Sequence, residues 1–324
     1  MLKTSVGAAT ALLLGLGVVS GAGVAVAQTP VVAVTSIVDH PALNAVHEGA
    51  KEALARAGFN DGKEIKVVFE NAQGQPATAV QIARKFVGEA PAVIIAISTP
   101  SAQAAAASTK TIPIVFSAVT DPVGAQLVAS AEKPGANVTG VSDRSPIDDQ
   151  VALIRELTPG VKTIGVLFNP GEPNSVTSVK ELKQAAEKVG LAVVEAPATK
   201  TAEVQGAARA LVGKADAAFV PTDNTVVSAL EAVAGALTAA KIPLYAADTD
   251  SVARGALASV GFNYRQVGTQ TGELAVRILK GEKPADLPVV FAQGTDLFLN
   301  KGVAEKIGVV LPEAALKRAV TVVD

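Results

Sequence analysis

The 324-residue sequence has no cysteine and no tryptophan, and it has only two histidines, two tyrosines and nine phenylalanines. Without cysteine the chain cannot form a disulfide, a thiolate metal site, a lipid-anchored cysteine or a cysteine nucleophile. The two histidines, His40 and His47, leave too little material for a histidine-based metal or catalytic cluster. We therefore expect no metal and no cofactor.

Charge and catalytic motifs are also scarce. Only 18% of the residues are charged and the formal net charge is -2, so the composition offers no basic surface for nucleic acid. The sequence contains no nucleophile-elbow motif, no phosphate-binding loop, no zinc-protease motif and no dinucleotide-binding glycine motif. A Ser-His-Asp triad stays open, but nothing else in the sequence indicates an enzyme.

The first 27 residues have the pattern of a secretory signal. Lys3 supplies a positive charge, an apolar run covers 11–19, and an Ala-Val-Ala cleavage site occupies 25–27. A short transmembrane anchor is the alternative, but glycine interrupts the apolar run. We expect export to the periplasm with cleavage after Ala27, and no membrane span in the mature chain.

From residue 31 onward, short β-rich stretches alternate with helical patterns. The first block has expected strands at 31–37, 65–69, 92–98 and 112–119, and helices at 41–58, 76–89 and 100–110. The second has strands at 163–168, 192–196, 217–221 and 242–247, and helices at 175–190, 202–214 and 225–241. A strand-like run at 256–263, a helix at 264–280 and an extended stretch at 288–291 follow. Repeated βαβ units predict an α/β fold with two doubly wound parallel-sheet lobes.

Polar side chains follow nearly every expected strand. Ligands bind beyond the C-terminal ends of the strands in open parallel sheets, so these side chains are candidate ligand-binding residues. They are Ser36, Asn71, Ser98, Thr99, Ser101, Ser117, Thr120 and Asp121 in the first block, and Asn174, Ser175, Asp223, Asn224 and Asp248 in the second. Each could instead cap the helix that it precedes. The two sets would converge if the two sheets faced each other across a cleft.

The helix that begins near Pro100 gives the strongest local pattern. Proline suits the first helical turn, and the alanine-rich sequence after it would leave free N–H groups aimed at the cleft. We expect Thr99 and the N–H groups of Ser101 and Ala102 to hold an anionic ligand group, a carboxylate.

An amino-acid ligand would also need a buried acceptor for its ammonium group. We favour Asp248 for this role over Asp223, because Asp248 directly follows a strand, and we expect Asp250 to cap a helix. The alternative is that Asp248 and Asp223 only cap turns. His40 could line the cleft or be structural, whereas His47 lies on a helix face and is expected to be structural.

Several stretches resemble the periplasmic substrate-binding proteins of ABC transporters, in the family that includes the tryptophan-binding type. They are 40–43 (HPAL), 71–74 (NAQG), 98–104 (STPSAQA), 113–122 (PIVFSAVTDP), 137–143 (NVTGVSD), 220–224 (VPTDN), 248–252 (DTDSV), 270–273 (QTGE) and 279–282 (LKGE). The similarity extends from about residue 31 to 310. Together these stretches are highly specific, although each alone is weak.

The resemblance implies a type I periplasmic-binding fold with three crossovers, near 142, 261 and 289. The first lobe would comprise 30–142 plus 262–288, and the second 143–261 plus 289–324. The protein would be a monomer that binds a small molecule and works with an ABC permease and its ATPase.

The ligand and the exact role stay open. Characterised relatives of this kind bind aromatic amino acids, but this chain has no tryptophan and few aromatic residues. Phe116 or Phe168 could supply an aromatic wall, and tryptophan itself is disfavoured as the ligand. The alternatives are a ligand sensor of the same fold and, less favoured, an exported α/β enzyme. A LacI-like regulator is disfavoured by the signal and by the missing helix-turn-helix.

Overall fold

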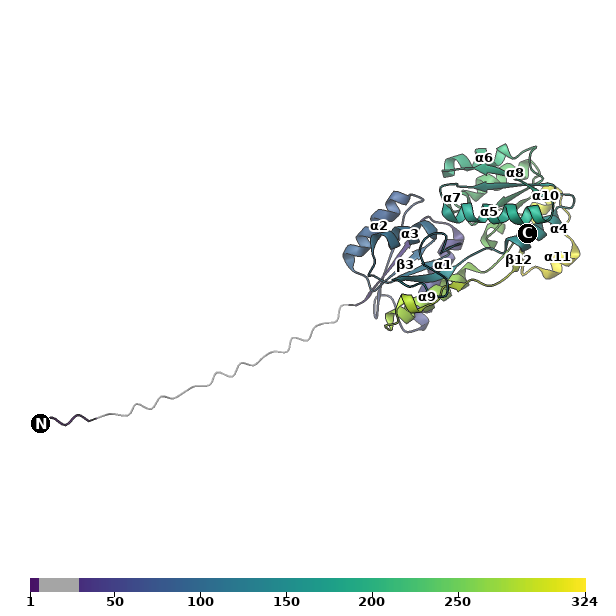
Figure 1. The fold of residues 1–324 in the computed structure, drawn as a ribbon. Coiled ribbons are helices and arrows are strands. Elements are labelled where there is room, and N and C mark those ends of the chain that lie inside the picture. The colour runs from purple at the N-terminus through teal and green to yellow at the C-terminus, as the bar shows by residue number, and fades with distance from the viewer. Residues whose placement is uncertain (6–28) are drawn as a thin grey trace.

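A computed structural model describes residues 1–5 and 29–324 of the chain, and Figure 1 shows two α/β lobes side by side. The apolar run and the cleavage site of the expected signal lie outside the described residues. Within the described residues, no helix combines the length and the apolar character needed to cross a membrane.

The first lobe is built on a six-stranded sheet in the order β11-β5-β4-β3-β1-β2, in which all neighbouring strands are parallel. The strands are β1 (Val31–Ser36), β2 (Lys66–Asn71), β3 (Val93–Ile97), β4 (Ile114–Ser117), β5 (Val138–Ser142) and β11 (Val290–Phe291). β3 and β4 are wholly buried, because they are apolar and covered on both faces.

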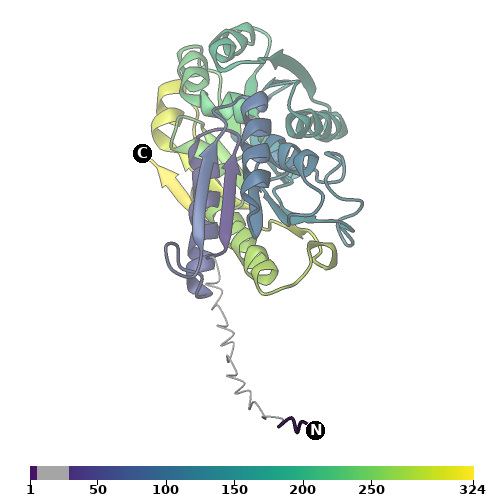
Figure 2. The same cartoon turned by 90° about the vertical axis from the view of Figure 1, so that its left-hand side faces the viewer.

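Four helices cover this sheet. α1 (Pro41–Arg56) packs against α9 (Tyr264–Leu279), and α2 (Pro76–Glu89) packs against α3 (Thr99–Ser108). Figure 2 shows β1 and β2 with helices on either side of them. Because the strands are parallel and paired in register, Ser36, Ile97 and Ser117 lie together at the C-terminal ends of β1, β3 and β4.

The second lobe has a seven-stranded sheet in the order β13-β12-β10-β9-β8-β6-β7. Its strands are β6 (Thr163–Phe168), β7 (Ala192–Pro197), β8 (Ala217–Val220), β9 (Leu244–Ala246), β10 (Ala258–Gly261), β12 (Asp296–Asn300) and β13 (Thr321–Val323). β12 is antiparallel to β10, unlike the other pairs, with Gly261 opposite Asp296. The chain leaves this lobe at Gly261 and returns at the same end, so the returning strand must run the other way.

The helices of the second lobe are α4 (Ile147–Leu157), α5 (Pro173–Lys188), α6 (Val204–Ala210), α7 (Asn224–Ser228), α8 (Leu230–Ala239), α10 (Lys301–Ile307) and α11 (Glu313–Arg318). The single helix expected over 225–241 is broken at Ala229. The hydroxyl of Ser228 donates to the carbonyl of Thr225, a local bond that competes with helix propagation.

The chain passes between the lobes after β5, after β10 and after β11. The third crossing differs from the expected boundary at 289, because β11 pairs with β5 through Val290 and Val141 and so still belongs to the first sheet. The stretch 137–143, expected as an extended crossover, contributes the strand β5. Short elements near the C-terminus, from β12 to β13, were not expected.

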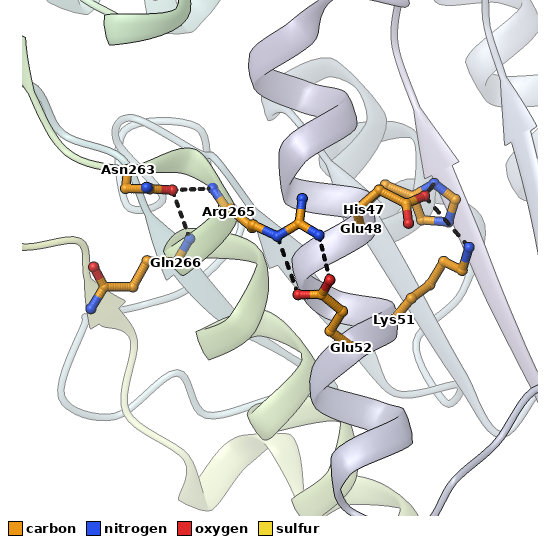
Figure 3. A network of polar contacts seen from close by, with 7 residues as sticks. All are labelled: His47, Glu48, Lys51, Glu52, Asn263, Arg265 and Gln266. Atoms are coloured by element: carbon orange, nitrogen blue, oxygen red, sulfur yellow. Dashed lines mark hydrogen bonds and ion pairs between the residues drawn. The ribbon is translucent and has the colours of Figure 1, made fainter. Parts of the chain in front are cut away.

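Glycine lets α1 and α9 approach each other very closely. A Cβ atom on Gly49 would lie 2.1 Å from the Arg265 carbonyl oxygen, and one on Gly268 would lie 2.1 Å from the Val46 carbonyl oxygen. Arg265 of α9 also forms a two-pronged ion pair with Glu52 of α1, which Figure 3 shows. The contact fixes α9, which follows the second crossing, to the first lobe.

Gly268→Ala should therefore destabilise the protein. The added Cβ would overlap backbone rather than a movable side chain, so the helices would have to separate, and we expect a loss of about 1–3 kcal/mol in the free energy of unfolding. Gly235→Ala in α8 is the matched control, since no atom lies within 4 Å of the added Cβ. It should be neutral or stabilising by up to about 1 kcal/mol. Urea titrations of both variants test this, and equal stabilities would contradict it.

Candidate ligand-binding site

A cavity lies between the lobes, at the C-terminal ends of strands from both sheets. It is lined by His40, Ala42, Leu43, Ser98, Ala118, Thr120 and Tyr264 from the first lobe, by Asn174, Thr222, Asp223, Asn224, Val227 and Asp248 from the second, and by Asp143 at the first crossing. The space that the centre of a water molecule can reach is about 20 Å³. That holds about one water, so the lobes are closed on each other.

Six of the thirteen candidate residues lie in this lining. They are Ser98, Thr120, Asn174, Asp223, Asn224 and Asp248. His40, for which two roles were open, lines the cavity as well. Asp143 and Tyr264 were not among the candidates. Asp143 ends a stretch that was expected as an extended crossover, and Tyr264, although it follows the strand-like run at 256–263, was expected only as the start of a helix. Asp143 does follow β5, so recognising 138–142 as a strand would have pointed to it.

Five other candidates have local structural roles instead. The hydroxyl of Ser36 donates to the Val38 carbonyl, and that of Ser175 donates to the Asp223 carboxylate. Asn71 and Asp121 accept hydrogen bonds from nearby backbone N–H groups, and the Ser117 hydroxyl is bonded to the Thr271 hydroxyl. None of these five lines the cavity.

The start of α3 differs from the expected anion site. Thr99 and Ser101 are buried outside the cavity lining, and their hydroxyls have no hydrogen-bond partner in the described residues. The N–H of Ala102 donates to the Ser98 carbonyl at 3.0 Å, because the helix already closes its first turn there. Its N–H is therefore not free for a ligand, and Ser98 is the residue of this segment that reaches the cavity.

Two hydrogen bonds join the lobes across the cavity. The Ser98 hydroxyl donates to Oδ1 of Asn224 at 3.0 Å, and the hydroxyls of Thr120 and Thr222 lie 3.1 Å apart. Ser98 has a φ of 79°, a left-handed conformation that is unusual for a non-glycine residue and that clusters at functional sites. The contacts hold the first-lobe strand ends against the start of α7.

Carboxylates dominate the charge of the cavity, and neither lysine nor arginine lines it. Burial raises the pKa of Asp223 to about 7, and the neighbouring Glu172 carboxylate adds to this effect. Burial raises the pKa of Asp143 to about 6 and also raises that of Asp248. Arg254, outside the lining, opposes the rise at Asp248, but no lysine or arginine lines the cavity itself, so a positively charged ligand group would stabilise the ionised forms of these carboxylates.

Asp248 both caps a turn and lines the cavity. Its carboxylate accepts from the N–H of Ser251 at 2.9 Å and from the Ser251 hydroxyl at 2.6 Å. The expectation that Asp250 would be the capping residue is therefore wrong, because the short 3₁₀ turn begins one residue after Asp248. Asp223 likewise caps α7 through the N–H of Val226. Capping and lining the cavity coexist in both residues.

A larger groove, of about 860 Å³, adjoins the cavity and shares Asn224 with it. It lies between the N-terminal turns of α2 and α3 in one lobe and of α5 and α7 in the other. Among residues 1–5 and 29–324, no cluster of three or more His, Cys, Asp or Glu side chains could hold a metal ion. The arrangement is suited to binding a small polar molecule between two lobes.

The family model for ABC transporter substrate binding proteins matches residues 31–323. The chain belongs to this family. It is 44% identical, over 83% of its length and 78% of the relative's, to a tyrosine-binding protein of Clostridioides difficile. Proteins of this family bind solutes and are not enzymes, which confirms the expectation from the sequence that this protein is not an enzyme.

Two solved structures of similar proteins show different lobe arrangements. An ABC domain in complex with L-Trp from Streptococcus pneumoniae is 38% identical with a TM-score of 0.89, over 91% of this chain and 100% of that one. A ligand-free, open substrate binding protein from Clostridium difficile is 43% identical but has a TM-score of only 0.69, over 91% and 99% of the two chains. The L-Trp complex has the lower sequence identity but the higher TM-score, so the lobes here are arranged as in that complex.

The aromatic walls expected from phenylalanine are absent from the described lining. Phe116 and Phe168 both lie in hydrophobic cores, one in each lobe, because their strands place these side chains against helices. Tyr264 is the aromatic residue that reaches the cavity, and its ring packs at a tilt against Phe262.

The stability of the empty protein should fall as pH rises from about 4 to about 7. Asp223 has a pKa of about 7 in the folded state against 3.8 ordinarily, so between these values the unfolded chain loses its proton first and is stabilised relative to the folded protein. Asp223→Asn should reduce the loss by about 1–3 kcal/mol. Urea midpoints at pH 5, 6, 7 and 8 measure it, and parallel pH profiles for both proteins would contradict the assignment.

Proposed function

We propose that the protein is the periplasmic binding component of an ABC uptake system and holds an aromatic α-amino acid between its lobes. The observation that carries the proposal is a closed cavity lined by three desolvated carboxylates and by no lysine or arginine. Such a cavity requires a cationic group from its ligand, because buried unpaired charges are costly.

The ammonium group of the ligand would bind in the second lobe. Asp248 keeps acceptor capacity after its two bonds to Ser251, since a carboxylate offers about four acceptor positions. Nearby, Asn174 uses its Nδ2 atom on Glu172 and on the Thr222 carbonyl, which leaves its buried Oδ1 without a partner. Both atoms are acceptors only, as an ammonium group requires.

The carboxylate of the ligand would bind the hydroxyls of Ser98 and Thr120 in the first lobe. In the closed state the Ser98 hydroxyl bonds to Asn224, and the Thr120 hydroxyl bonds to Asp143 and Thr222. A ligand would replace these bonds by bonds to itself. An aromatic side chain is supported by the tyrosine-binding relative and by the similar structure that holds L-Trp. The cavity must widen to admit it.

The transport role rests on the family, whose binding proteins deliver ligand to a permease that an ATPase drives. The closed arrangement, compared with the open similar structure, supports a ligand-dependent change of shape that a permease could recognise. The signal-like first 27 residues support export to the periplasm, and the absence of cysteine supports a protein without a lipid anchor.

Asp248→Asn should abolish most of the affinity for an aromatic amino acid. Asparagine keeps the size and the capping ability of the side chain but removes the charge that meets the ammonium, so we expect a loss of about 2–5 kcal/mol in binding free energy. Calorimetry with L-Tyr and L-Trp measures this. Asp250→Asn is the control, since this neighbouring carboxylate does not line the cavity. Equal affinities in the two variants would contradict the assignment.

Export is tested separately. The protein recovered from the periplasm of an expressing cell should begin at Gln28, because cleavage after Ala27 removes the signal. N-terminal sequencing and intact mass measure this. A protein that keeps residues 1–27 and pellets with membranes would show that the segment is an anchor.

A further inference from the structure

His40 has an unexplained place in the cavity. It directly precedes Pro41, the first residue of α1, and occupies the N-cap position in an extended conformation with φ of -158°. A residue at this position commonly uses its side chain to cap the helix, but the His40 side chain makes no such bond. The residue is 8% exposed and lines the cavity instead.

A ring nitrogen of His40 lacks a partner. Its Nδ1 is buried and has no hydrogen bond to any described residue. A buried polar atom without a partner is costly, so native structures usually supply one from protein, water or ligand. Asn174 Oδ1 is the other unpartnered buried side-chain atom in the lining, and the proposed function already assigns it to the ligand's ammonium.

The ring is neutral at physiological pH. Burial lowers the pKa of His40 to about 3, with Arg254 acting in the same direction and Asp39 opposing it. A neutral imidazole has one N–H donor and one acceptor nitrogen. It therefore suits a neutral hydrogen-bonding group better than the charged ends of an amino acid.

The surroundings of His40 are those of a side-chain subsite. Ala42 and Leu43, from the first turn of α1, line the cavity beside it, and both are apolar. The hydroxyl of Tyr264 is already used, because it donates to Asp143 at 3.0 Å. A ligand side chain that reaches this end meets apolar surface and the neutral imidazole of His40.

We propose that His40 is a specificity-determining residue whose unpartnered ring nitrogen accepts a hydrogen bond from the ring donor of the ligand, a phenol O–H or an indole N–H. This inference rests on the proposed function, because it assumes an aromatic amino acid in the cavity. It assigns the side-chain end of the ligand to the start of α1 and the charged end to the second-lobe carboxylates and the strand ends.

Matched ligand pairs test the role. Wild-type protein should bind L-Tyr more tightly than O-methyl-L-tyrosine, or L-Trp more tightly than 1-methyl-L-tryptophan, by about ten- to a hundredfold, because the methylated partner leaves the nitrogen unpaired. L-Phe, which lacks a ring donor and adds no bulk, should show the same loss against L-Tyr. Calorimetry supplies the affinities.

Variants separate a hydrogen bond from packing. His40→Phe keeps a ring but removes both nitrogens, so the preference for ring donors should disappear while the affinity for L-Phe stays within about threefold of wild type. His40→Asn places an amide near the Nδ1 position and should retain part of the preference. His47→Phe is the control, because His47 lies on α1 and stacks on Phe69 but does not line the cavity. It should leave the preference unchanged.

The outcomes distinguish the two proposals. If wild-type protein binds no aromatic amino acid, the proposed function fails and the role of His40 fails with it. If it binds L-Tyr or L-Trp but His40→Phe keeps the full preference for ring donors, only the role of His40 is overturned. Circular dichroism and melting temperatures of the empty variants confirm that each is folded before the affinities are compared.

Discussion

The hydrogen bond from the Tyr264 hydroxyl to Asp143 joins two of the three chain crossings, and the geometry of the cavity depends on it. Asp143 follows β5 at the first crossing, and Tyr264 begins α9 just after the second. The same carboxylate accepts from the Thr120 hydroxyl at 3.1 Å, which ties the crossings to the end of the first sheet. Because the pKa of Tyr264 is raised well above its ordinary value by burial and by Asp143, the phenol remains a donor. Any movement of one lobe against the other must therefore either keep the bond between Tyr264 and Asp143 or break it.

Much of the fold could be predicted because buried parallel strands are continuous apolar runs. β6 was predicted with the bounds that it has, and α2 likewise, since proline marks its start. β5 was missed as a strand because it is short and contains Gly140. That glycine is required where it is, since a Cβ there would lie 2.1 Å from the Phe116 carbonyl oxygen. α4 carries signals that could have found it, namely acidic residues in its first turn and Arg155 in its last.

The candidate site was harder to predict than the fold. A polar residue after a strand caps a turn, lines the cavity or does both, and Asp248 shows that the two roles need not exclude each other. The sequence pattern also cannot show which helix start is free. α1 and α3 both have proline in their first turn, yet α3 presents the Ser98 hydroxyl to the cavity, whereas α1 presents the His40 ring with its unpartnered nitrogen. These differences depend on how the two lobes meet, which no local pattern contains.

In the closed structure Asp143, Asp223 and Asp248 are buried around a cavity that no lysine or arginine lines, and their raised pKa values reflect the cost. A ligand favours the closed state only to the extent that it binds that state more tightly. Moving the population from 1:99 to 99:1 takes about 5.5 kcal/mol of differential binding. One hydrogen bond to a charged group contributes about 1.5–3 kcal/mol, so at least two to four are needed. Neither lobe alone offers enough such contacts to both ends of an amino acid, because the hydroxyls of Ser98 and Thr120 lie in one lobe and the carboxylate of Asp248 lies in the other. In the proposed binding mode, this division of the site between the lobes would allow ligand binding to drive closure.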